Sequence, residues 1–284
     1  MFRKMLVCTD LSPASNALIQ CVEELKGIGM EEIVLTHVIY VANTPGLEEM
    51  LAEEARPVLE RQKNILEDQG IRVTVEMPVG LPAHTLNETA EKHDVSAILI
   101  GSHGKGILQA AILGSVSAKL LGLARRPVLL ARIAVLEGDK CHLVCGRLFI
   151  KILFPSDFSE CAEHALNYLG KIAVETGCPI TIMHVLEEKP ADAATARQLE
   201  EEQRFFLEAK KHRLKSQGRS EVSIFLATGE PAREIISMAN EGNFSIIVMG
   251  SKGKGLLREV FLGSVANEVA RHAGVPVLLI PAVR

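Results

Sequence analysis

One stretch of sequence occurs twice in this chain, 149 residues apart, as the separation of Gly101 and Gly250 shows. Each copy reads as an apolar run, a glycine-rich loop and a Gly-Ser pair before a helical pattern, with the spacing G-x2-G-x9-G-S. The apolar runs, residues 97–100 and 246–249, are typical of strands buried on both faces of a sheet. Because the whole pattern recurs, it predicts two copies of one α/β unit rather than a chance recurrence of glycines.

The loop and the Gly-Ser pair are suited to binding an anion. Gly101 and Gly104 are expected to permit positive φ angles and a close approach of the backbone to a ligand. Ser115 and Ser264 stand where an N-cap would stand, and backbone N–H groups and the helix dipole attract negative charge there. The pattern therefore predicts a phosphate site in each half. The alternative is a pair of strand-to-helix turns that need glycine only for their shape.

The rest of the chain is duplicated as well. The matching segments are residues 5–10 and 150–157, His37-Val38 and His184-Val185, 80–83 and 229–232, and 127–130 and 276–279. The offset drifts only from 147 to 149 residues, as the pairs Asp10 to Asp157 and Gly101 to Gly250 show. We therefore expect domains at 1–133 and 149–284, joined by a linker at 134–148 with room for a short strand of its own.

Within each half, apolar runs alternate with amphipathic patterns. In the first half we expect strands at 5–10, 32–38, 71–77, 97–100 and 127–131, and helices at 12–25, 47–68, 80–94 and 116–124. This alternation predicts an α/β fold, with a parallel sheet covered by helices on both faces. Ligands of such sheets bind at the carboxyl ends of the strands, where the strand order reverses. An order of 3-2-1-4-5 would place Asp10 and Asp157 beside the glycine loops of their own halves.

Composition excludes several classes of protein. The net charge of −4, an aromatic content of 4% and the absence of Trp argue against a nucleic-acid partner. Met1-Phe2-Arg3-Lys4 leads directly into a strand, so we expect no signal peptide, and no apolar run reaches membrane-spanning length. Six cysteines in 284 residues do not suggest a disulfide scaffold. The expected location is the cytoplasm.

The chain resembles a tandem universal stress protein over about residues 3–133 and 149–284. The resemblance rests on Thr9-Asp10-Leu11-Ser12 and Pro155-Ser156-Asp157-Phe158-Ser159, the His-Val pairs, the Gly-x-Pro-Ala turns and both glycine loops. It implies two Rossmann-like or flavodoxin-like domains, each with a five-stranded parallel sheet in the order 3-2-1-4-5. It further implies a stress-response or regulatory protein that binds an adenine nucleotide: ATP, ADP or AMP.

Carried over by position, the resemblance implies that Asp10 and Asp157 hold the adenosine and that Val38 and Val185 meet the adenine. The glycine loops would cradle the ribose and phosphates. The nucleotide-binding residues implied are Thr9, Asp10, Val38, Gly101, Ser102, His103, Gly104, Gly114, Ser115, Val116, Pro155, Ser156, Asp157, Val185, Gly250, Ser251, Lys252, Gly253, Gly263, Ser264 and Val265. The family often has Pro before the Thr/Ser-Asp pair, but Cys8 replaces it in the first half. Any Mg²⁺ is expected to be held mainly by phosphates and water.

Several alternatives stay open at this stage. A slow ATPase or a nucleotide-dependent transferase is the alternative function, although no catalytic set of residues repeats in both halves. Lys105 and Lys254 either reach a phosphate or are solvated loop lysines. His37 and His184 are expected to be structural rather than catalytic. Cys141, His142 and Cys145 supply three of the four ligands of a closed zinc site, or are plain linker residues.

The fifth strands predict how the halves assemble. Residues 127–131 and 276–280 are short, apolar and uncharged, and at a sheet edge they would invite pairing with another strand. In the resembling family the fifth strands pair across a dimer. We therefore predict that the two halves of this chain pair with each other, with a homodimer of chains and an unknown downstream protein as further partners. The fourteen residues 134–147, at about 3.3 Å each, are long enough to connect two halves that pair in this way.

Lysines introduced together at Leu129 and Leu278 are expected to loosen this pairing. Charged side chains on both edges disfavour strand pairing, so limited proteolysis should cut the linker faster than in the native chain. Halves that already behave as independent bodies in scattering and proteolysis of the native chain would contradict the pairing.

Overall fold

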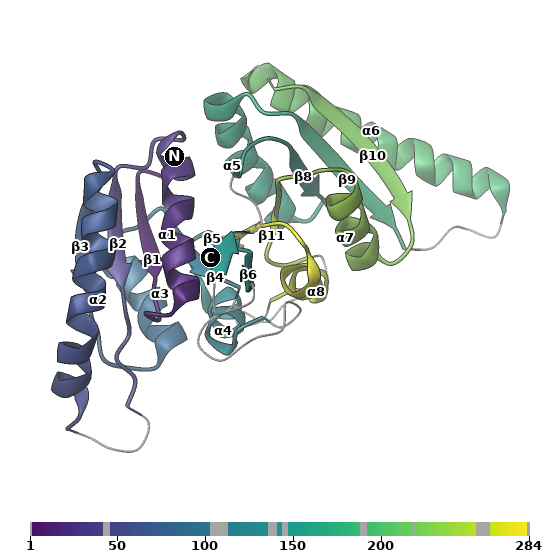
Figure 1. Ribbon diagram of the computed structural model, residues 1–284. Helices are drawn as coiled ribbons and strands as arrows, with labels where there is room; N and C mark the ends of the chain where they lie inside the picture. The colour runs from purple at the N-terminus through teal and green to yellow at the C-terminus, as the bar shows by residue number, and fades with distance from the viewer. Residues whose placement is uncertain are drawn as a thin grey trace. The chain divides into compact units, whose positions relative to one another are not determined.

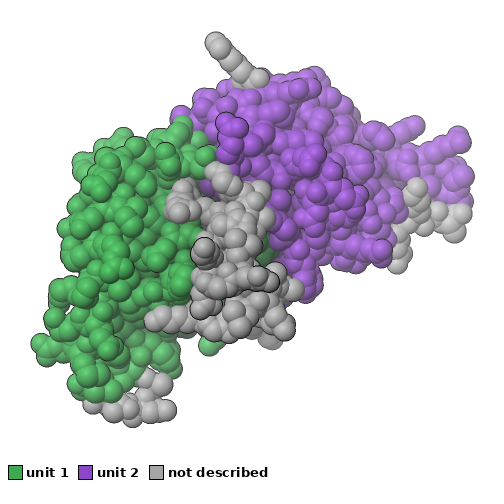
Figure 2. All heavy atoms as spheres, in the orientation of Figure 1, with its two compact units in different colours: residues 1–146 green, residues 147–284 purple. Residues whose placement is uncertain are grey.

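The computed structural model describes residues 2–41, 46–102, 113–135, 141–143, 147–187, 192–218, 220–253 and 262–282. The chain divides into two compact units, Met1–Gly146 and Arg147–Arg284 (Figure 2). Each unit is described below on its own.

The first unit alternates strands and helices (Figure 1). In chain order these are β1 (Lys4–Cys8), α1 (Pro13–Lys26), β2 (Glu32–Thr36), α2 (Glu48–Asp68), β3 (Arg72–Glu76), α3 (Pro82–Lys92), β4 (Ala97–Gly101), α4 (Ser115–Leu123) and β5 (Val128–Ala131). Neighbouring strands are parallel and follow the order β5-β4-β1-β2-β3. This order matches the expected one, and it places β1 directly beside β4.

The second unit repeats this arrangement. Its elements are β8 (Ile152–Pro155), α5 (Glu160–Thr176), β9 (Ile180–Leu186), α6 (Ala193–Gln217), β10 (Val222–Thr228), α7 (Pro231–Glu241), β11 (Ile246–Gly250), α8 (Ser264–His272) and β12 (Val277–Ile280). The parallel order β10-β9-β8-β11-β12 places β8 beside β11. The duplication read from the sequence is therefore a duplication of structure.

Burial explains why most strands read as apolar runs. Every residue of β4 and of β11 is buried, because helices cover both faces of the sheet. In the first unit α1 packs beside α2, and α3 packs beside α4. The two pairs cover opposite faces, since crossovers are right-handed and the chain reverses direction across the sheet between β3 and β4. The edge strands differ: β3 alternates between exposed and half-buried residues over its first three positions, and β10 does so over residues 223–226.

The segment expected to be a linker contains two short strands. β6 (Ile133–Val135) and β7 (Cys141–Leu143) pair antiparallel, and β7 lies against α1. The segment thus folds onto the first unit instead of forming a plain connection. Cys145, the third residue of the possible metal site with Cys141 and His142, lies outside the described residues. Within the part of the chain that the structure describes, no His, Cys, Asp or Glu cluster is suited to a metal ion.

No helix among the described residues combines the length and the apolar character that crossing a bilayer requires.

An ion-pair cluster at the end of β3 predicts a pH-dependent contribution to stability. The Glu76 carboxylate accepts a hydrogen bond from Lys92 Nζ at 2.9 Å, and His93 Nε2 lies 2.6 Å from the same oxygen. Burial alone would raise the pKa of Glu76, but the hydrogen bonds and charges of Lys92 and His93 outweigh it and hold that pKa below the ordinary 4.5. The ionised carboxylate therefore stabilises the fold at pH values above the ordinary pKa of 4.5. This stabilisation is lost as the pH falls through the lowered pKa of the folded state.

Glu76→Gln is accordingly expected to reduce the free energy of unfolding by about 1 kcal/mol at pH 6 and by much less at pH 3.5. Urea titrations at the two pH values measure the difference. Asp94→Asn is the control, because Asp94 pairs with Arg126 while its side chain is 87% exposed, so its loss should matter little. An equal effect of Glu76→Gln at both pH values would contradict the prediction.

Candidate functional site

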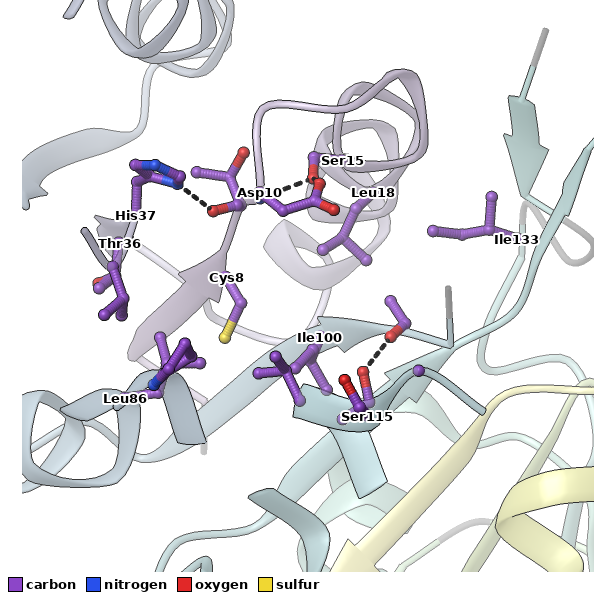
Figure 3. Close-up of a pocket in the computed structure, with 17 residues that line it drawn as sticks. Cys8, Asp10, Ser15, Leu18, Thr36, His37, Leu86, Ile100, Ser115 and Ile133 are labelled. Atoms are coloured by element: carbon purple, nitrogen blue, oxygen red, sulfur yellow. Dashed lines mark hydrogen bonds between the residues drawn. The ribbon is translucent and has the colours of Figure 1, made fainter. Parts of the chain in front are cut away.

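The first unit has a crevice of about 290 Å³ at the carboxyl ends of β1 and β4 (Figure 3). Its lining includes seven of the expected nucleotide-binding residues: Thr9, Asp10, Val38, Gly101, Gly114, Ser115 and Val116. Ser102 is buried directly after β4. His103 and Gly104 lie outside the described residues. The topology thus brings together residues that are more than a hundred positions apart in sequence.

The second unit has a larger crevice, about 860 Å³, at the corresponding ends of β8 and β11. Ten expected residues line it: Pro155, Ser156, Asp157, Val185, Gly250, Lys252, Gly253, Gly263, Ser264 and Val265. Ser251 is buried beside them. Both crevices lie at the switch point of the strand order, where α/β sheets bind ligands.

The aspartate after β1 is held by the start of α1. Oδ1 of Asp10 accepts hydrogen bonds from the Ser12 amide at 3.1 Å, the Ser12 hydroxyl at 2.5 Å and the Ser15 hydroxyl. The Ser15 hydroxyl also accepts from the Asp10 amide at 3.0 Å, and Figure 3 shows Ser15 and Asp10 joined. Leu11, between the aspartate and Ser12, has a φ of 65°, in the left-handed region. This turn fixes the carboxylate at the crevice.

The second unit builds the same turn with fewer hydroxyls. Oδ1 of Asp157 accepts from the Ser159 amide at 3.1 Å, and Phe158 has a φ of 61°. The Ser159 hydroxyl accepts from the Ala162 amide at 3.2 Å and caps α5. Ala162 occupies the position equivalent to Ser15, so no hydroxyl exists there to bind the carboxylate.

The glycines at and after the end of β11 allow close packing and do not have a left-handed backbone. The expected positive φ at Gly101 is wrong: the residue ends β4 and pairs with Ala131 in the extended ladder. In the second unit a Cβ on Gly250 would lie 2.9 Å from Cys161 Sγ, and one on Gly253 would lie 2.8 Å from Asp157 Oδ2. A side chain at either position would therefore collide with α5 or with the strand-end carboxylate.

The expected capping role of Ser115 and Ser264 is also wrong. Gly114 and Gly263 are the N-caps, and each serine is the first helical residue, so its side chain is past the capping position. Within the described residues no side chain caps either helix.

Each loop is closed by a hydrogen bond between its two ends. Gly114 N donates to Ser102 O at 2.9 Å, and Gly263 N donates to Ser251 O at 2.8 Å. These bonds hold the helix start next to the strand end. The first-turn N–H groups of α4 and α8 thus lie at a crevice. Because no side chain of the helix accepts their hydrogen bonds, an anion bound in the crevice could do so.

The paired histidines line the crevices and join neighbouring strands through Nδ1. His37 Nδ1 lies 2.9 Å from Thr9 O, and His184 Nδ1 lies 2.7 Å from Ser156 O. A carbonyl oxygen only accepts, so Nδ1 carries the hydrogen in both rings. Each ring thus ties the second strand to the end of the first, which supports the expected structural role.

Other residues of the crevices had no signal in the repeat pattern. Ser15, Leu18 and Ile133 line the first crevice, whereas Leu199 and Gln203 of α6 line the second. Pro82 and Pro231 also line their crevices, and the repeated Gly-x-Pro-Ala turns could have indicated them.

Cys8, in place of the family's proline, lines the first crevice, where burial strongly raises the pKa of its thiol. The thiol is therefore neutral and unreactive.

A cluster of aromatic and charged side chains lies next to the turn of the second crevice. The centroid of the Phe158 ring lies 4.4 Å from that of His184 and 5.6 Å from that of Phe206, and both ring pairs are tilted. Lys210 Nζ lies 5.2 Å from the Phe158 ring centre. Burial, followed by the charge of Arg213, lowers the pKa of Lys210 despite the opposing influence of Asp157. The cluster joins α6 to the turn that carries the aspartate.

Comparisons with known proteins agree with the duplication. The model of the universal stress protein family matches residues 1–132 and 149–281. Universal stress protein MJ0577 of Methanocaldococcus jannaschii is 30% identical over 155 residues, which are 46% of this chain and 96% of that protein. A universal stress protein of Mycolicibacterium smegmatis is 25% identical over 97% of this chain and 96% of its own. The crystal structure of a universal stress protein from Archaeoglobus fulgidus superposes with a TM-score of 0.78 at 28% identity, covering 100% of both chains.

Proposed function

The chain belongs to the universal stress protein family, and we propose that it is a regulatory protein that binds an adenine nucleotide in each of its two units. One observation carries the proposal. In both units a strand-end aspartate, the glycines that flank the loop (Gly101 and Gly114, Gly250 and Gly263) and a helix start without a side-chain cap line one crevice.

Each part of the crevice has a group on the nucleotide that it suits. The first-turn N–H groups of α4 and α8 and the hydroxyls of Ser115 and Ser264 would bind the phosphates. The carboxylates of Asp10 and Asp157 would accept hydrogen bonds from the hydroxyl groups of the ribose. The half-buried Val38 and Val185, at the ends of the second strands, would contact the base. Magnesium, where it accompanies the nucleotide, would be held mainly by phosphates and water, since that aspartate is the only acidic group that the described linings of both crevices share.

Calorimetric titration of the full chain with ATP, ADP and AMP tests the proposal. We expect two sites per chain for at least one of the three nucleotides, and the nucleotide that co-purifies with the protein should be the one bound most tightly. A chain that binds none of the three would contradict the proposal.

Incubation with ATP and Mg²⁺ separates binding from catalysis. Turnover well below about one per minute, far under usual enzyme rates, would agree with a binding protein. Faster turnover would favour the alternative of an ATPase.

A further inference from the structure

We propose that the two crevices are not equivalent, and that the second unit binds the nucleotide at least ten times more tightly than the first. This inference rests on the proposed function and ranks its two sites. The reason lies in three equivalent positions, which carry Ser15, Leu18 and Ile133 in the first unit and Ala162, Ala165 and Ala282 in the second.

The three larger side chains narrow the first crevice. Ser15 and Leu18 come from α1, Ile133 comes from β6, and all three line the crevice although each is less than a tenth exposed. Figure 3 shows Ser15 and Leu18 beside Asp10. Of their alanine counterparts only Ala162 lines the second crevice. The first crevice is accordingly the smaller one, with a volume of about 290 Å³ against about 860 Å³ for the second.

The aspartates also differ in what they offer a ligand. Oδ1 of Asp10 already accepts from three donors, two of which are the hydroxyls of Ser12 and Ser15. A carboxylate oxygen has about two lone-pair directions, so a nucleotide hydroxyl must displace an internal donor there. In the second unit Ala162 has no hydroxyl, so the counterpart of the Ser15 hydrogen bond is absent, whereas Ser12 and Ser159 alike accept the amide hydrogen bond that caps their helix. Competition from this helix is therefore weaker at Asp157.

The second crevice has an additional wall. Leu199 and Gln203 lie one turn apart on α6 and line it together with Glu187, which directly follows β9. In the first unit no residue of α2, the equivalent helix, is among the described lining residues. A nucleotide in the second unit would therefore bury more of its surface, which favours tighter binding.

Two single-site chains test the ranking. Gly263→Val should leave only the first site and Gly114→Val only the second, because each places a branched side chain at the helix start that faces the phosphates. Titration of both chains with ATP should give a dissociation constant at least ten times smaller for the Gly114→Val chain. Melting curves of both variants check that each is folded.

Exchange of the serine and the alanine tests the cause. Ala162→Ser in the Gly114→Val chain should weaken ATP binding about fivefold, as expected for one added competing hydrogen bond. Ser15→Ala in the Gly263→Val chain should strengthen binding by a similar factor. Ser96→Ala is the matched control, because Ser96 donates to Lys4 O at the other end of the sheet, and it should change neither constant.

The outcomes separate the inference from the function on which it rests. Equal dissociation constants in the two single-site chains, or tighter binding by the Gly263→Val chain, would overturn the inference and leave the proposed function intact. A native chain that binds no nucleotide would overturn both. Exchanges that leave both constants unchanged would overturn the role of Ser15 and Ala162.

Discussion

Gly263→Val is expected to remove nucleotide binding from the second unit while the first unit keeps its site. Gly263 is the N-cap of α8, with φ of −60° and ψ of 148°, and it lines the crevice. A Cβ there would lie 3.3 Å from Lys252 Cα and 3.3 Å from Ser251 O, so even one carbon is a tight contact with backbone. The two further carbons of valine would occupy space at the helix start that a phosphate requires.

Calorimetric titration with ATP should show the stoichiometry falling from two to one, with the affinity of the lost site reduced at least a hundredfold, about 2.7 kcal/mol. Gly263→Ala is the matched control and should retain part of the affinity, because its single carbon demands a smaller shift. Gly114→Val should produce the corresponding loss in the first unit. A Gly263→Val chain that still binds two nucleotides with native affinity would show that the phosphates do not lie at this helix start.

Gly250→Val is expected to destabilise the second unit by about 3 kcal/mol, an overpacking effect at the upper end of the usual range. Gly250 is buried at the end of β11, beneath the first turn of α5. A Cβ would lie 2.9 Å from Cys161 Sγ and 3.1 Å from the Cys161 carbonyl carbon. The helix must therefore move away from the sheet, since backbone as well as side chain is in contact.

Thermal or urea unfolding of the full chain measures this effect as a lower midpoint than that of the native chain. The control compares the single variant Gly250→Ala with the double variant that carries both Gly250→Ala and Cys161→Ala. Removing the sulfur should restore only part of the lost stability, because the contact with the carbonyl carbon remains. A Gly250→Val chain as stable as the native one would mean that α5 accommodates the side chain without displacement.

The sequence by itself was enough to predict the topology and the location of the crevices. The nearly constant offset between the halves showed that one α/β unit occurs twice, and the buried runs at β4 and β11 marked strands inside the sheet. The residues at the ends of β1 and β4 could be placed together because parallel strands that lie side by side end at the same edge of the sheet. That step needs only the order of the elements, which a periodic pattern of apolar residues conveys.

Only the tertiary structure decided what the individual residues do at that edge. It made Gly114 the cap instead of Ser115, and it gave Gly250, the counterpart of Gly101, a packing role against Cys161. It also brought Leu18 and Ile133 into one crevice and Leu199 of α6 into the other. The physical reason is that these roles depend on distances of a few ångströms between elements far apart in the chain. Apolar periodicity records which face of an element is buried, but it carries no information about which atoms of another element meet that face.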